Sequence, residues 1–172
     1  MVIDNTPLYD EIWNAVYSRL HFSPSSEYRG HSFEVPLPFQ ISGSYSVYAA
    51  EDMTEEQIGL LGRTFRSIFA RITKPGRKIY ALDWHHSAFL YDPGSISEQT
   101  DCTVKDARYP DGGYFAYFPA FYPDGDYYFF IEENFEFGYL GHPWRQEIWI
   151  FGSELMNEAD KAYRSLGWKR LR

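Results

Sequence analysis

Apolar residues recur at helical spacing in three stretches of the chain. In the first stretch, Ile12, Val16 and Leu20 repeat every four residues, which is the period of one helix face. Asp10 and Glu11 precede most of this series, and acidic side chains stabilise the start of a helix through its dipole. We therefore predict a helix from about Leu8 to Leu20.

The second stretch opens with a capping box. In Thr54-Glu55-Glu56-Gln57 the Thr hydroxyl and the Gln side chain can each bind a backbone N–H at a helix start. An apolar face follows, which Lys74-Pro75-Gly76 ends: Ile58, Leu61, Phe65, Ile68, Phe69 and Ile72. The third stretch begins at Ser153, the predicted N-cap, and ends at Gly167. It predicts a C-terminal helix over about 153–166.

Alternating and aromatic runs between the helices predict strands. Phe39–Ser42 and Tyr45–Tyr48 alternate apolar and polar residues around Gly43, which indicates a short strand or hairpin. Ile79–Trp84 and Ala88–Tyr91 are two further strands, and the three residues between them suit a tight turn. The polar segment from Pro93 to Asp106 is predicted to be a loop.

Two Pro-Asp-Gly turns, thirteen residues apart, each lead into an aromatic run. They begin at Pro110 and Pro123. Proline presets φ, aspartate binds its own backbone, and glycine accepts a positive φ, so the tripeptide is typical of a turn. The echo indicates two successive units of turn and strand. We also predict that strands starting near Tyr127 and near Glu147 pair antiparallel through the turn Gly141-His142-Pro143-Trp144.

Helices at both ends and in the middle, around consecutive strands with short connections, are typical of an α+β fold. The 172 residues suit a single domain, 1–172, which consists mainly of an antiparallel sheet with about three helices. Aromatic residues make up 20% of the chain, far above ordinary usage. They indicate either a sheet-rich core with tyrosines on its outer face or an aromatic binding surface.

The formal charge of -8 bears on the choice of partner. An acidic chain gains little from releasing the counterions of phosphates, so we expect no nucleic-acid partner. The charge suits solubility, or a basic protein partner. Cys102 is the single cysteine, which excludes an intrachain disulfide and a cysteine metal cluster. The N-terminus lacks the features of a signal peptide, and the longest uncharged aromatic run is too short to span a membrane. We expect a cytoplasmic protein with no membrane partner.

Three groups of residues are candidates for chemistry. His85-His86 invites a metal site, but zinc needs three or four ligands, and no HExxH or CxxC spacing supplies the others. No metal or cofactor is therefore predicted. Asp124 and Asp126 could act as an acid–base pair, although aspartate in a Pro-Asp-Gly turn usually accepts backbone N–H groups. His142 beside Trp144 could act as a base if a carboxylate orients it.

Asp83 and Asp126 are the candidate orienting groups for His142. We expect Asp126 and His142 to lie within reach of each other at one end of the sheet, because both stand at the ends of the strands that we predict to pair. No nucleophile elbow, P-loop or GxGxxG sequence accompanies them.

Several short motifs resemble the bacterial family called domain of unknown function 2716. They are Ala81–His86, Tyr122–Tyr128, Phe135–Gly138 with Gly141–Trp144, and Ile150–Leu155, and Trp13 and Phe22–Ser25 also fit. The resemblance covers about residues 9–155. Two positions depart from the family pattern: His85 stands where Gln is common, and Arg145 stands where an acidic residue is common.

The resemblance implies a small bacterial cytoplasmic protein and carries no activity with it. It adds weight to the residues within its motifs as binding residues: Asp83, Trp84, His85, Asp124, Asp126, Tyr127, His142 and Trp144. No catalytic residue is assigned. We favour a protein-binding module that neutralises a basic toxin, in the manner of an immunity protein, over an enzyme. Two alternatives are a small hydrolase that uses Asp124, Asp126 and His142, and a small-ligand pocket lined by Tyr and Trp.

Overall fold

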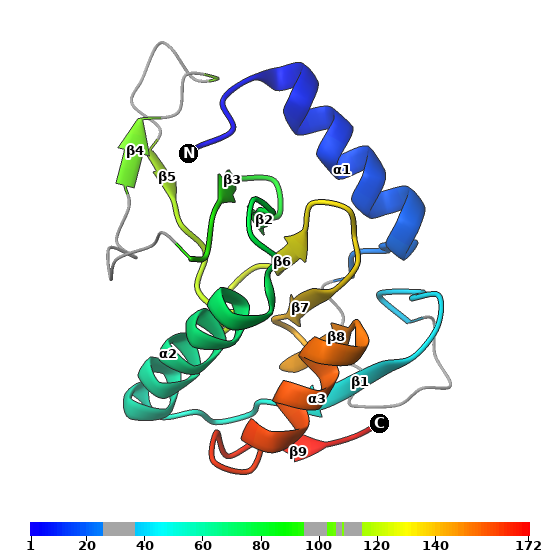
Figure 1. The fold of residues 1–172 in the computed structure, drawn as a ribbon, viewed down its shortest axis with the longest axis vertical. Coiled ribbons are helices and arrows are strands. Elements are labelled where there is room, and N and C mark those ends of the chain that lie inside the picture. Colours follow the sequence, from blue (N-terminus) through cyan, green and yellow to red (C-terminus); the bar gives the residue numbers. More distant parts are fainter. Residues whose placement is uncertain (26–36, 95–102, 106–107, 109–114) are drawn as a thin grey trace.

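A seven-stranded antiparallel sheet forms the centre of the protein (Figure 1). The computed structural model describes residues 1–25, 37–94, 103–105, 108 and 115–172. In chain order the elements are α1 (Thr6–Leu20), β1 (Tyr45–Ala49), α2 (Glu55–Ile72), β2 (Ile79–Asp83), β3 (Ala88–Tyr91), β4 (Thr103–Lys105), β5 (Phe115–Tyr117), β6 (Tyr128–Glu132), β7 (Gly138–His142), β8 (Glu147–Phe151), α3 (Ser153–Ala162) and β9 (Lys169–Arg170). The α+β prediction is confirmed.

The helices follow the predicted apolar faces, and their ends differ in detail. Helix α1 starts at Thr6, because the side chain of Asn5 caps it by accepting the Leu8 N–H at 3.2 Å. The capping box at the start of α2 is confirmed. Helix α3 does not have Ser153 as its N-cap; Gly152 caps it with no side-chain hydrogen bond. It also ends at Ala162 rather than near residue 166, since turns follow up to Gly167.

The strand order in the large sheet is β3-β2-β6-β7-β8-β1-β9. Strand β7 lies between β6 and β8 and pairs antiparallel with both. The prediction that the strands starting near Tyr127 and Glu147 pair directly is therefore wrong, and these two strands run in the same direction on either side of β7. The predicted turn at 141–144 is in part strand, because Gly141 and His142 belong to β7; residues 143–146 form the turn that joins β7 to β8.

Two glycines explain why β7 was missed. Gly138 and Gly141 suggest turns in the sequence, yet both lie within the strand. A Cβ atom on Gly138 would come within 2.5 Å of the Phe151 ring, and one on Gly141 within 2.9 Å of Pro123. These glycines therefore make room for neighbouring rings in the sheet, which is a recognised role of glycine within strands.

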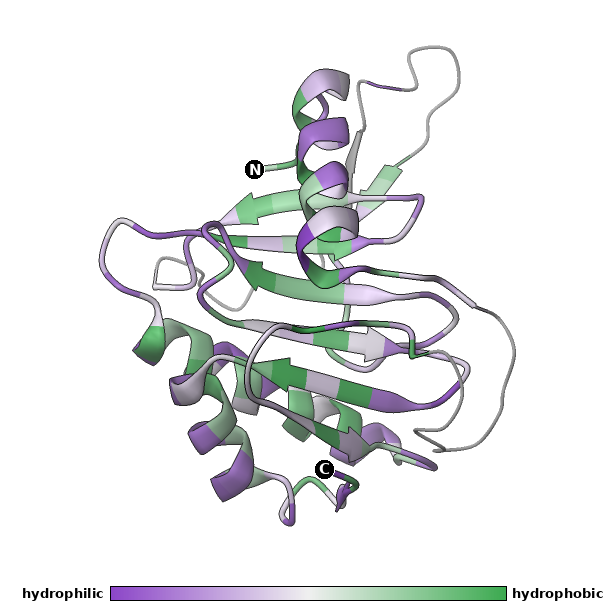
Figure 2. Ribbon diagram, turned by 90° about the vertical axis from the view of Figure 1, so that its right-hand side faces the viewer, coloured by the Kyte–Doolittle hydropathy of each residue, from purple (hydrophilic) through white to green (hydrophobic). Residues whose placement is uncertain are grey.

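Each face of the sheet buries its own apolar cluster. Helix α1 covers one face, where residues such as Val47, Leu82, Phe129 and Trp149 contact Trp13 and Val16 of the helix layer. Helices α2 and α3 cover the other face, over Tyr48, Ala81, Phe130, Tyr139 and Ile148. Figure 1 shows α1 on one side of the strands and α2 with α3 on the other, and Figure 2 shows the strands side by side with α1 crossing over part of the sheet. Both faces are buried, which accounts for the aromatic content.

The remaining predictions are confirmed in part. Strands β2 and β3 form the predicted hairpin, and β1 covers the predicted 45–48 region and extends to Ala49, whereas 39–42 forms no strand. Strand β4 lies inside the segment predicted to be a loop and pairs with β5 in a separate two-stranded ribbon. The first Pro-Asp-Gly turn lies outside the described residues, although β5 and β6 follow the two turns. In the part of the chain that the structure describes, no helix has the length and apolar character that crossing a membrane requires.

Candidate functional site

The predicted site residues all lie at one end of the large sheet. The pairing of Asp83 with Tyr128, of Tyr128 with Gly141, and of His142 with Glu147 puts the end of β2, the start of β6 and the end of β7 side by side. The start of β8 and the end of β1 meet at the same edge, through the pair Ala49–Glu147. Strand register thus brings together residues as far apart in the sequence as Ala49 and Glu147.

The two faces of the sheet divide these residues into two groups. Side chains alternate between faces along a strand, and Leu82 belongs to the cluster under α1, so Asp83 points to the opposite face. The carboxylates of Asp83 and Asp126 both lie beside the His86 ring. His142 instead contacts Tyr127 and Trp144, whose rings pack on the α1 side. The structure thus places Asp126 and His142 at the same end of the sheet but in different clusters, and we assign them no shared site.

His142 is the centre of the cluster on the α1 side. It is buried, its Nδ1 accepts the Arg145 backbone N–H at 3.3 Å, and its Nε2 lies 3.1 Å from the Tyr127 hydroxyl oxygen. Burial, helped by the Arg145 guanidinium, lowers the pKa of His142 to about 3, so the ring is neutral at physiological pH. Because Nδ1 accepts a hydrogen bond, the single ring proton is assigned to Nε2, which donates to Tyr127.

The Tyr127 hydroxyl extends this network to a distant part of the chain. It accepts the Ser25 N–H and donates to the Ser25 C=O, both at 2.8 Å. Burial raises the pKa of Tyr127 to about 12, so the hydroxyl keeps its proton. A neutral imidazole and a protonated phenol form a structural clamp, and neither is poised for proton transfer near neutral pH.

A buried ion pair lies next to this clamp. The Arg145 guanidinium donates from Nε and Nη2 to the two carboxylate oxygens of Glu147, at 2.8 and 2.9 Å. The Trp149 indole N–H donates to the same carboxylate at 2.9 Å. Arg145 is one of the two residues at which the chain departs from the family pattern, and here its charge is opposite that of a fully buried glutamate. Sequence reasoning missed Glu147, because strand position gave no sign that its side chain would be buried.

The second cluster consists of Asp83, His86 and Asp126. Nδ1 of His86 lies 3.2 Å from Oδ1 of Asp83 and 3.3 Å from Oδ2 of Asp126. Burial, opposed by His86, raises the pKa of Asp83 to about 6, and burial also raises that of Asp126. His86 was not among the predicted binding residues. Its spacing of three residues from Asp83, across a tight turn, is the signal in the sequence that would have found it.

His85 and Trp84 shape the turn that carries this cluster. His85 has a φ of 65°, a left-handed conformation that is uncommon for a residue with a side chain. Its ring lies 4.0 Å from the Trp84 ring, and the Trp84 indole N–H donates to the Tyr17 hydroxyl at 2.9 Å. Trp84 therefore ties the turn to α1. The ring contact and this hydrogen bond hold the turn in one conformation.

Asp124 is exposed in the turn before β6, beside Gly125 with its φ of 91°. Its C=O accepts the Tyr128 hydroxyl at 3.1 Å. Burial raises the pKa of Tyr122, and the carboxylates of Asp124 and Asp52 raise it further, which places them near the same ring. The residues that follow β1 and begin α2 at this end are acidic as well: Glu51, Asp52, Glu55 and Glu56. This end of the sheet is thus strongly acidic.

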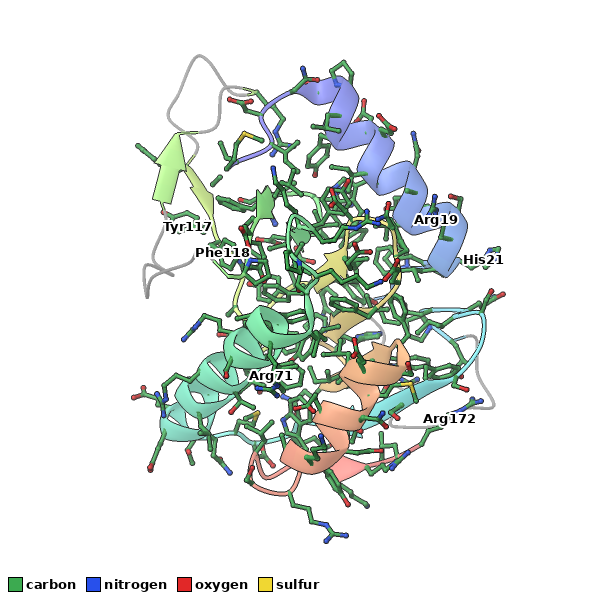
Figure 3. The ribbon with its side chains drawn as sticks, viewed as in Figure 1. Arg19, His21, Arg71, Tyr117, Phe118 and Arg172 are labelled. Atoms are coloured by element: carbon green, nitrogen blue, oxygen red, sulfur yellow. The ribbon has the colours of Figure 1, made fainter. Side chains whose placement is uncertain are left out.

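Two exposed aromatic residues stand on β5, next to the acidic end. Phe115 is 45% exposed and Tyr117 is 60% exposed, while Ala116 between them is fully buried. The Tyr117 N–H donates to the Ser87 hydroxyl at 3.1 Å, which fixes β5 beside the β2–β3 turn. Figure 3 shows Tyr117 at the edge of the molecule on the β5 strand. The sequence offered only the length of the aromatic run as a hint of this exposure.

Two hollows that the described residues line lie near the start of α3. One of about 150 Å³ and one of about 440 Å³ share Glu136, Gly152 and Ser153. Neither is lined by a tyrosine or tryptophan, so they do not match the predicted pocket for a small ligand.

Comparison with known proteins gives a family and no activity. Residues 5–120 and 118–156 match the family described as "Protein of unknown function (DUF2716)". The chain is also similar to the "Uncharacterized protein YxiI" of Bacillus subtilis (strain 168), at 29% identity over 155 residues, which cover 88% of this chain and 86% of that protein. No solved structure matches the chain.

Proposed function

The chain belongs to the family described as Protein of unknown function (DUF2716), and because this description names no activity, we propose from the geometry that the protein binds and neutralises a basic protein, as immunity proteins do. The observation that carries the proposal is the pair of exposed rings, Phe115 and Tyr117, held beside the acidic end of the sheet. The partner would be a toxin with a basic active cleft.

The exposed rings supply the anchor that a tight interface needs. Large aromatic side chains in the centre of an interface contribute most of its binding energy, because they bury much area at little entropic cost. Strand β5 presents Phe115 and Tyr117 on one face and inserts Ala116 into the protein, so the two rings keep a fixed spacing. A rigid pair of this kind is pre-organised for binding.

The acidic end supplies complementary charge. Within the described residues, no lysine or arginine forms a salt bridge with Asp83, Asp124 or Asp126. The exposed carboxylates of Asp124, Asp52, Glu55 and Glu56 are available to a cationic partner. Charge of one sign speeds association with a surface of the opposite sign and excludes surfaces of the same sign.

The hydrolase alternative receives less support from the geometry. It needs His142 as a base beside Asp126, yet His142 is buried against Tyr127 and its pKa is too low for such a role.

The test is a binding measurement with a defined partner. If a secreted toxin domain is encoded next to this gene, it is titrated in catalytically inactive form with the full chain, and rates are measured by surface plasmon resonance. Phe115→Ala with Tyr117→Ala should raise the dissociation rate by about 100-fold, since two anchors are lost. Tyr117→Phe keeps the ring and should have little effect.

Charge is tested with matched single substitutions. Asp124→Asn at the acidic end should slow association and weaken its salt dependence, whereas Glu154→Gln at the start of α3, at the other end of the sheet, should not. Equal effects of the two changes would mean that net charge alone matters. An unchanged affinity after removal of both rings would contradict the proposed surface.

A further inference from the structure

Three metal-ligating atoms meet on the β2–β3 turn. They are Oδ1 of Asp83, Nδ1 of His86 and Oδ2 of Asp126, and they lie within 4.8 Å of one another. His86 is partly exposed, with 45% of its side chain accessible, so an ion can reach the group from solvent. Two carboxylates and one imidazole are a ligand set that divalent transition metals accept.

The spacing of these atoms is compatible with metal coordination. Zinc binds nitrogen and carboxylate oxygen at about 2.0–2.2 Å, so neighbouring ligands of a tetrahedral ion are about 3.4 Å apart. The two distances from His86 Nδ1 are 3.2 and 3.3 Å. The first is also a hydrogen bond between Nδ1 of His86 and Oδ1 of Asp83. Because Nδ1 carries at most one proton, it can donate to only one of the two carboxylates at a time, whereas a metal ion would contact both.

The surrounding hydrogen bonds hold the three ligands in place. The Tyr127 N–H donates to Oδ1 of Asp126 at 2.7 Å, which leaves Oδ2 directed at His86. The backbone N–H of His86 donates to the Asp83 C=O at 3.0 Å, and the Arg108 guanidinium donates to the His86 C=O at 2.6 Å. Contacts that orient ligands in this way are a general feature of metal sites.

We propose that Asp83, His86 and Asp126 bind one divalent transition-metal ion of the zinc type. Three protein ligands leave at least one coordination position for water or for a group of another molecule. Calcium is a poor fit, because it requires six to eight oxygen ligands. This proposal does not rest on the binding of a protein partner.

The charges of the cluster favour a cation. Two half-buried carboxylates lie on either side of one imidazole. A bound cation compensates both carboxylates. Carboxylate and imidazole bind a metal ion only when they are deprotonated, so metal affinity should decline at acidic pH.

The experiment titrates Zn²⁺ alone into the full chain, stripped of metal with a chelator, by isothermal titration calorimetry. A Cys102→Ser background removes the thiol as a ligand. We expect one ion per chain, with micromolar affinity. His86→Ala and Asp126→Asn should each weaken binding at least tenfold, while His21→Ala, which removes the exposed imidazole at the end of α1 labelled in Figure 3, should leave it unchanged.

Two readouts separate ligation from a loss of folding. The melting temperature of each variant in chelator shows whether it folds, and Co²⁺ absorption near 600 nm reports the coordination of the ion directly. Folded His86→Ala protein that binds Zn²⁺ as tightly as the parent would overturn the proposal, because the ion would then be bound elsewhere. Absence of Zn²⁺ binding to the parent chain at millimolar concentration would also overturn it.

Discussion

The hydroxyl oxygen of Tyr127 lies 3.1 Å from Nε2 of His142, and the same hydroxyl makes two hydrogen bonds with the backbone of Ser25. One side chain thus joins the start of β6, the end of β7 and the segment after α1. Both Tyr127 and His142 are buried. The stability of the sheet end on the α1 face therefore depends on one phenol.

Tyr127→Phe should lower the free energy of unfolding by about 2 kcal/mol, because it leaves the buried His142 N–H and the Ser25 backbone without their partner. Urea unfolding followed by fluorescence measures the change. Tyr45→Phe is the control, since the Tyr45 hydroxyl accepts only from the exposed Arg172 guanidinium among the described contacts. Equal changes in the free energy of unfolding would show that the buried hydrogen bonds of Tyr127 contribute no more to stability than the exposed one of Tyr45.

The stability of the protein should fall between about pH 6.5 and pH 3 through His142. Its pKa is near 6.5 when unfolded and about 3 when folded, so the unfolded chain binds the proton more tightly in this window. The loss should reach about 2–3 kcal/mol at pH 4.5 relative to pH 7. Unfolding of His142→Gln at both pH values checks this. A variant with the same pH dependence as the parent would rule out the histidine as its source.

Asp83 should make the stability of the protein depend on pH in the opposite direction. Its pKa is raised from 3.8 to about 6 in the folded protein, so the folded state binds the proton more tightly and loses stability as the pH rises through this range. Asp83→Asn, measured with chelator present, should stabilise the protein by about 1–2 kcal/mol at pH 7.5 and by almost nothing at pH 4, after allowance for partial exposure. A gain that is equal at both pH values would point to packing rather than charge.

Breaking the buried ion pair should be costly. Arg145→Met leaves the Glu147 carboxylate buried without its cation and should lower the free energy of unfolding by about 3–5 kcal/mol. The double change Arg145→Met with Glu147→Gln should cost less than the sum of the two single changes, because no unpaired charge remains. Chemical unfolding of all four proteins measures the coupling, and additive costs would mean that the pair does not interact.

Gly138→Ala should lower the free energy of unfolding by about 1–3 kcal/mol, since the added Cβ overlaps the Phe151 ring across the sheet. Phe151→Leu in the same chain should restore part of the loss. Gly62→Ala in α2 is the matched control. Its Cβ meets only the flexible Arg66 side chain, and the change should be neutral or stabilising. A tolerated Gly138→Ala would argue against the close approach of β7 and β8.

The sequence alone determined those helices, caps and turns that depend on residues close together in the chain. The capping box at Thr54, the apolar face of α2 and the β2–β3 hairpin were predicted, because caps, periodicity and turns depend on residues a few positions apart. The sequence also indicated which end of the sheet holds Asp83, Asp126 and His142, since strand ends follow from turns.

Tertiary structure alone decided which of these residues meet. Strand β7 was missed because Gly138 and Gly141 look like turn residues until Phe151 and Pro123 are seen to fill the space above them. The separation of Asp83 from His142, and the burial of Glu147, depend on which sheet face each side chain occupies. A shift of one residue in strand register reverses that choice, and register is fixed by packing between distant strands, not by any local pattern.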